Sequence, residues 1–110
     1  MSAPSCLVFY GLSVRVEVSE VDAIERRTDP RIAKARKAQL KHYFGRFMVN
    51  NQAQHLLLVG RKIGEIGVEG EMAVMVDRRA LEELMTEVGE RLRAAGWAGE
   101  PSLHALHESD

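Results

Sequence analysis

The hydrophobic pattern of this chain changes between strand-type and helix-type periods, and the order of these segments constrains the fold most strongly. Residues 6–18 are rich in apolar and β-branched side chains and alternate apolar and polar positions in their second half, which predicts a strand. A short acidic helix is expected over 20–27. A second, basic helix is expected over 30–46, with Asp29 as its N-cap and Pro30 at its first position.

The second half of the chain contains the clearest helix. Asp77 is placed to cap it and Gly96 to end it, and its apolar positions recur at intervals of three and four. Strands are expected at 55–59, 72–76 and 102–108, and the glycine-rich segment 60–70 is expected to form a hairpin between the first two.

These segments follow one another in the order β-α-β-β-α-β, with the first helical connection broken at Pro30. That order is typical of a ferredoxin-like α+β two-layer sandwich, in which an antiparallel four-stranded sheet carries both helices on one face. The length of 110 residues predicts a single domain over 1–110, with loose termini at 1–5 and 108–110. Because this fold carries many unrelated functions, the topology alone implies none of them.

Composition excludes several kinds of site. The single cysteine, Cys6, rules out an internal disulfide and a zinc site built on cysteine pairs. His104 and His107 are three apart on an expected strand and therefore point to opposite faces, so we expect no metal site and no cofactor. No apolar run is long enough to span a membrane, and no basic residue precedes the first apolar stretch, so we expect a cytoplasmic protein without membrane association.

The charge distribution is uneven although the net charge is only −1. Residues 26–46 hold eight basic residues and one acid, for a balance of +7. On a helix over this segment, Lys34, Lys37 and Lys41 share one side, which is a possible phosphate-contacting surface for nucleic acid. The alternative is an ordinary solvated helix face, which the absence of an aromatic residue among the lysines favours.

Arg36 falls inside the apolar arc of the same expected helix. A guanidinium held among apolar groups can grip a carboxylate or a phosphate in bidentate fashion. Its stem can equally pack against the core while its head reaches water or an acid of another element. The sequence leaves both a functional and a structural role open for Arg36.

The first strand is apolar on both sides, since Leu7 and Phe9 face one way and Val8 and Tyr10 the other. We therefore expect one sheet face to lie uncovered, which usually marks an interface. The leading hypothesis is a homodimeric binding or interaction module without catalytic chemistry, in contact through Tyr10, Leu12 and Met75. A shallow ligand pocket with the same lining is an alternative.

Two further functions remain open. One is a nucleic-acid-associated protein that uses the basic helix 30–46. The other is a small-molecule enzyme of the dimeric ferredoxin-like kind, in which Arg36, Tyr43 or His42 supplies the polar groups of a pocket between sheet and helices.

Overall fold

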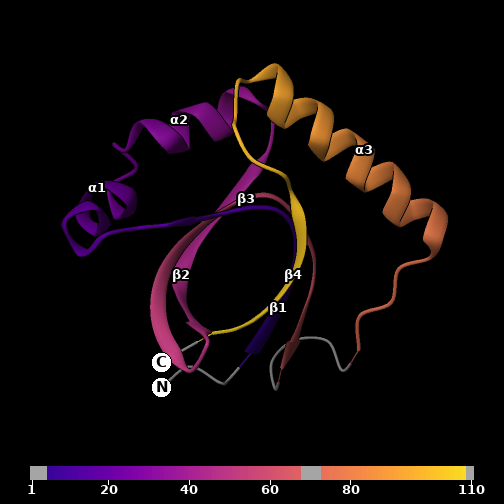
Figure 1. Ribbon diagram of the computed structural model, residues 1–110, viewed down its shortest axis with the longest axis horizontal. Coiled ribbons are helices and arrows are strands. Elements are labelled where there is room, and N and C mark those ends of the chain that lie inside the picture. The colour runs from indigo at the N-terminus through magenta and orange to yellow at the C-terminus, as the bar shows by residue number, and fades with distance from the viewer. Residues whose placement is uncertain (1–4, 68–72, 109–110) are drawn as a thin grey trace.

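The computed structural model describes residues 5–67 and 73–108 and shows an α+β fold with one four-stranded antiparallel sheet and helices over one of its faces (Figure 1). No helix among these residues is long and apolar enough to cross a membrane. The elements are, in chain order, β1 (Ser5–Arg15), the 3₁₀ helix η1 (Val18–Glu20), α1 (Val21–Glu25), α2 (Pro30–Lys37), β2 (Lys41–Val49), β3 (Gln52–Gly67), α3 (Arg78–Ala94) and β4 (Ser102–His107).

The strands lie in the order β2-β3-β1-β4, and every neighbouring pair is antiparallel. β2 and β3 form a hairpin whose two-residue turn is Asn50-Asn51, with φ values of 51° and 64°. Positive φ at both turn positions matches the right-handed twist of the flanking strands, and asparagine is among the few residues that adopt it readily. β1 and β3 are the long central strands that hold the two edges together.

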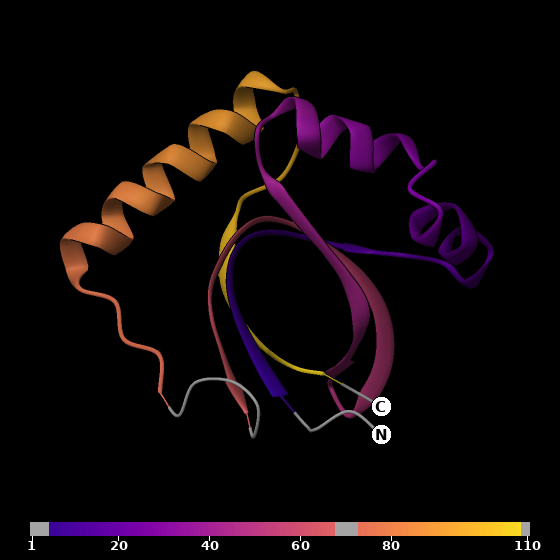
Figure 2. The ribbon, with the colours of Figure 1, turned by 180° about the vertical axis from the view of Figure 1, so that it is seen from behind.

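The sheet is strongly curved, so that its strands run around a common centre (Figures 1 and 2). Gly11 and Gly60 face each other in the central pair, with φ values of 155° and 154°. A Cβ on Gly11 would lie 2.1 Å from the Val59 carbonyl oxygen, so only glycine allows the two backbones to approach in this way. The curvature also brings the two edge strands together, since an isolated bridge joins Phe47 of β2 to Glu108 just after β4.

The curvature gives the sheet two separate cores. The helix-side core lies between the outer face and the three helices and includes Tyr10, Leu12, Leu57, Val59 and residues of α1, α2 and α3. The inner core lies on the concave face, and its buried members are Leu7, Phe9, Phe47, Leu56 and Leu58. Fully buried apolar side chains on both faces stabilise each layer through removal of surface from water.

The helices follow local signals at their ends. Asp29 caps α2 by accepting a hydrogen bond from the Arg31 backbone N–H at 2.9 Å, and Asp77 caps α3 by accepting from that of Ala80 at 2.8 Å. α3 stops at Gly96, which has a φ of 79°, and the Trp97 N–H donates to the Leu92 carbonyl at 2.9 Å. This is the Schellman arrangement, in which a left-handed residue lets the chain satisfy the last carbonyls.

The structure confirms the α+β class, the single antiparallel four-stranded sheet, the break at Pro30 and the limits of the helix after Asp77. The element order is β-α-α-β-β-α-β, which is not the βαββαβ order of the ferredoxin-like expectation. Ser5 and Glu108 are not loose, because the Ser5 hydroxyl donates to the Glu108 carboxylate at 3.0 Å. The other residues of those two expected loose ends lie outside the described part of the chain.

Three predicted elements are wrong in extent or type. The basic helix 30–46 ends at Lys37, and residues 41–46 belong to β2, because pairing with β3 competes successfully with helix formation there. The predicted strand 55–59 extends over 52–67, which includes most of the expected glycine hairpin. Residues 73–76 form no strand, while residues 68–72 lie outside the described residues.

Candidate functional site

The three residues expected to form a sheet interface do not share a surface. Tyr10 and Leu12 are each only 7% exposed and pack in the helix-side core. Met75 lies in the segment between β3 and α3 and is 91% exposed. The expectation of an open apolar sheet face is wrong, because helices cover the outer face and the curled sheet buries its own inner face.

Tyr43 and Arg36 are also separated. Tyr43 lies on the concave side, where its ring meets that of Phe9 edge to face at 5.6 Å between centroids. Arg36 is exposed on α2, and the apolar arc expected around it does not exist, since Leu40 and Tyr43 lie beyond the end of the helix. A pocket that uses both side chains is therefore not formed, and Arg36 has no buried partner.

The three lysines of the expected helix stripe have different surroundings. Lys34 spans from α2 to the end of α3, where its Nζ donates to the Gly96 carbonyl at 3.2 Å and lies 4.7 Å from the centre of the Trp97 ring. This cation–π contact and hydrogen bond complete the C-terminus of α3. Lys37 is exposed at the end of α2, and Lys41 is exposed at the start of β2.

A different set of basic residues remains exposed on α2, β2 and the turn before α2. We call it the basic surface, and it consists of Arg27, Arg36, Lys37, Lys41 and Arg46. Within residues 5–67 and 73–108, none of these five makes an ion pair. Seven other bases each pair with a carboxylate, namely Arg26, Arg31, Arg61, Lys62, Arg78, Arg79 and Arg91. Arg15, Lys34 and Arg93 make no ion pair in the described residues either, so five of the eight unpaired bases lie on these neighbouring segments, with Lys41 and Arg46 on opposite faces of β2.

His42 lies within this surface. It pairs with Val59 across the β2–β3 ladder, and because Val59 belongs to the helix-side core, His42 faces the helices rather than the concave side. Its side chain is half-buried. Burial, and next the positive charges of Arg27 and Arg36, lower the pKa of His42 below its usual value. Arg27 follows α1, and Arg36 lies on α2.

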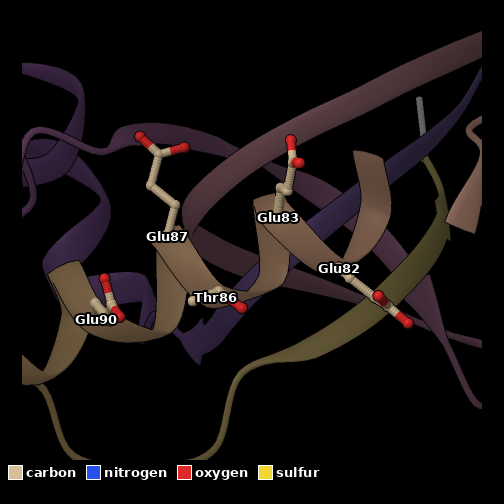
Figure 3. Close-up of a pocket in the computed structure, with 5 residues that line it drawn as sticks. All are labelled: Glu82, Glu83, Thr86, Glu87 and Glu90. Atoms are coloured by element: carbon tan, nitrogen blue, oxygen red, sulfur yellow. The ribbon is translucent and has the colours of Figure 1, made fainter. Parts of the chain in front are cut away.

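A second polar surface is the acidic stripe of α3, shown in Figure 3. It forms a shallow hollow whose lining is Glu82, Glu83, Thr86, Glu87 and Glu90. Arg78 and Arg79 pair with Glu82 and Glu83 one turn away, and Glu87 accepts from both Arg61 and Arg91. The stripe is largely neutralised by these arginines, and no group of metal-ligating residues occurs in the described parts of the chain.

The remaining histidines and the cysteine are dispersed. The His104 Nε2 lies 3.2 Å from the Gly11 carbonyl oxygen on the concave side, whereas His107 pairs with Cys6 on the other face. His55 stacks on Phe44 at 5.8 Å between centroids, and its buried Nδ1 makes no hydrogen bond. These groups do not converge on one point.

The basic surface was only partly predictable from the sequence. The charge balance of 26–46 identifies the segment, but Arg27 and Arg46 are not singled out, because no local signal shows that the chain turns back at Gln39. Comparison of the chain with protein-family models, with curated proteins and with solved structures finds no match.

Proposed function

We propose that this protein is a binding module without catalytic chemistry that holds a nucleic acid on the basic surface. The observation that carries the proposal is the concentration of five exposed, unpaired bases on α2, β2 and the preceding turn. Neighbouring like charges repel each other and destabilise the folded chain, and a polyanion relieves that repulsion. A protein with a net charge of −1 gains no general affinity for nucleic acid from its total charge, so the local distribution matters.

The mode of binding follows from the kinds of side chain present. The basic surface contains arginine and lysine but no fully exposed aromatic ring, since the neighbouring Phe44 is half-buried against His55. Contacts to phosphates position a nucleic acid without reading its bases. We therefore expect weak discrimination between sequences and a strong dependence on salt.

The small-molecule enzyme is less well supported. Arg36 and His42 lie on the helix side of the sheet and Tyr43 on the concave side, so the polar groups assigned to such a site do not share a cavity.

The test is fluorescence anisotropy with a labelled thymidine oligonucleotide of about 12 nucleotides, titrated over a range of salt concentrations. For a single strand, each phosphate contact contributes about −0.7 to the slope of the logarithm of the affinity against the logarithm of the salt concentration. Five contacts therefore predict a slope of about −3.5. Lys37→Gln and Arg46→Gln should each weaken binding and reduce the slope by about 0.7.

Arg93→Gln is the matched control, because Arg93 is an exposed arginine on α3 that makes no ion pair in the described residues. It should leave binding unchanged. A wild-type protein that does not bind at low salt, or binding that is equally weakened by Arg93→Gln, would overturn the proposal.

A homodimer is the second candidate function, at a different surface from the one expected. Leu103 is 58% exposed on the helix-side face of β4, and Met85 is 39% exposed on α3. A contiguous exposed apolar patch is typical of contact surfaces, and Met85 and Leu103 are the exposed large apolar residues of α3 and β4. Light scattering should then show a dimer that Leu103→Gln converts to a monomer, and a wild-type monomer at tens of micromolar would exclude this function.

A further inference from the structure

β4 is an edge strand whose free edge carries none of the usual features that prevent strand pairing. It pairs with β1 on one side, and the six residues of Ser102–His107 include no lysine, arginine, carboxylate, proline or bulge. The opposite edge strand, β2, carries the exposed bases Lys41 and Arg46 instead. Edge strands without charged side chains or proline are templates for the addition of another strand. β4 is therefore the edge at which a further strand can join this sheet.

The hydrogen-bond pattern of β4 shows which of its backbone groups are free. The Glu108 N–H donates to the Ser5 carbonyl at 2.9 Å, so the backbone groups of Glu108 point toward β1. Because this direction alternates along an antiparallel ladder, residues 102, 104 and 106 also point toward β1, whereas 103, 105 and 107 point away from it. β2 reaches the end of β4 through the bridge between Phe47 and Glu108. The open part of the edge is thus residues 103–105.

Leu103 and Ala105 each present one free N–H and one free C=O at this open edge. Within residues 5–67 and 73–108, neither residue makes a backbone hydrogen bond outside the ladder with β1. Both residues are exposed, and Leu103, opposite Tyr10 on the helix-side face, is 58% exposed. In both views the start of β4 lies on the other side of the curl from the β2–β3 turn (Figures 1 and 2). The hairpin therefore leaves the approach to these groups open.

The free groups of β4 are complementary to those of a second copy of β4. In an antiparallel pair related by a two-fold axis, opposite residues point to the same face, so the axis passes beside a residue rather than between two. With the axis beside His104, Leu103 lies opposite Ala105 of the second copy, and every free N–H and C=O of both strands finds a partner.

The neighbouring registers do not match. With the axis beside Leu103, Ala105 would lie opposite Pro101, which has no N–H to donate. With the axis beside Ala105, Leu103 would lie opposite His107, at the end of the strand that β2 already reaches. The arrangement of free backbone groups thus selects one register and one occupant of the edge.

We propose that this protein forms a dimer in which the β4 strands of two copies pair about a two-fold axis beside His104. The inference rests on the second candidate function, the homodimer, and specifies the joint by which the two copies meet. The two sheets then become one continuous sheet. The exposed side chains of Leu103 and Ala105 face each other across the joint, where their contact removes apolar surface from water.

The ends of the joint bring acidic side chains together. In this register Glu108 approaches Glu100 of the second copy, and both residues are exposed. Exposed like charges oppose association weakly, and salt screens them. The dimer should therefore strengthen slightly as salt is added, whereas binding of a nucleic acid weakens.

Proline at position 105 tests the joint, because it removes an N–H that the single chain does not use. Ala105→Pro should leave the protein folded, since proline is tolerated where the N–H of an edge strand points outward. The two-fold axis makes the substitution act twice, so sedimentation velocity should show a dissociation constant at least about tenfold higher than that of the wild type. His104→Pro is the matched comparison, because it removes an N–H that points toward β1, and it should lower the melting temperature.

An engineered disulfide tests the register. In the proposed pair, His104 faces His104 of the second copy at a non-hydrogen-bonded position, where Cα atoms lie about 4.5 Å apart. That separation fits a disulfide. In a Cys6→Ser background, His104→Cys should therefore form a covalent dimer in a glutathione buffer. Met75→Cys in the same background is the control, because Met75 is 91% exposed but lies outside the sheet, and it should form none.

The outcomes separate this joint from the second candidate function. If the wild type is a dimer that Leu103→Gln disrupts and Ala105→Pro does not, the homodimer stands and the pairing of β4 is refuted. If Ala105→Pro does not fold, its N–H is used within the chain and the proposal is wrong. If the wild type is a monomer at tens of micromolar and His104→Cys gives no more covalent dimer than Met75→Cys, both are wrong, and the edge is left to an extended segment of another protein.

Discussion

Asp29 offers the most direct test of how the α1–α2 region is held together. Asp29 is 8% exposed, and its side chain accepts from three nitrogens of Arg31, namely the backbone N–H and Nε at 2.9 Å and a terminal guanidinium nitrogen at 2.8 Å. The same guanidinium nitrogen donates to Glu20 at 2.9 Å, so Arg31 ties η1 to the start of α2. Asp29→Ala removes the helix cap and the ion pair together.

The magnitude follows from these two parts. Loss of the N-cap costs about 1 kcal/mol of the free energy of unfolding. Loss of the largely buried charged hydrogen bonds costs about 1 to 2 kcal/mol more, because Arg31 retains Glu20 and its side chain is 23% exposed. Asp29→Ala should therefore destabilise the protein by about 2 to 3 kcal/mol. Asp29→Asn keeps an acceptor for the cap and should cost about 1 kcal/mol less than alanine.

Urea unfolding monitored by the fluorescence of Trp97, the single tryptophan, measures both variants. The pH dependence supplies a further check. The side-chain hydrogen bond from Arg31 lowers the pKa of Asp29, so its contribution is complete above the unfolded-state pKa of about 4 and is lost as the pH falls through the folded-state pKa. The difference between wild type and Asp29→Asn should shrink in acid. Variants that lie within about 0.5 kcal/mol of wild type would refute the assignment of a stabilising role to these contacts.

Other predictions concern the backbone. Gly60→Ala should destabilise the protein by about 3 kcal/mol or prevent folding, since its Cβ would lie 2.2 Å from the Tyr10 carbonyl oxygen at a φ of 154°. Gly45→Ala, whose Cβ would meet the Phe47 ring at 3.2 Å, should cost only about 1 kcal/mol. If urea unfolding shows the same loss of stability for Gly45→Ala and Gly60→Ala, the close approach at Gly60 is not what the curvature of the sheet requires. Gln39→Gly should stabilise by about 0.5 kcal/mol, because the relief of left-handed strain exceeds the added unfolded-state entropy, and a lower melting temperature would contradict this.

Only part of the candidate site can be predicted from the sequence, because the charge of a segment is a local property and its fold is not. The excess of positive charge over 26–46 is visible in the sequence, and so is the nucleic-acid alternative. The expected stripe of Lys34, Lys37 and Lys41 is wrong, because Lys34 packs on Trp97 and Lys41 lies on a strand. The point at which β2 begins depends on the left-handed residue Gln39, whose residue type does not signal a turn.

Elements that carry their own start and stop signals follow from local residue patterns. Asp77, the apolar stripe and Gly96 define α3, and Asp29 with Pro30 defines the start of α2, because caps and periodicity act within a few residues. The end of α2 and the covering of the second sheet face depend on contacts in the folded protein. Residues 41–49 become a strand through pairing with β3, and the facing glycines at 11 and 60 let the sheet curl over its own apolar face. Both outcomes arise from contacts between distant parts of the chain, which no short segment specifies.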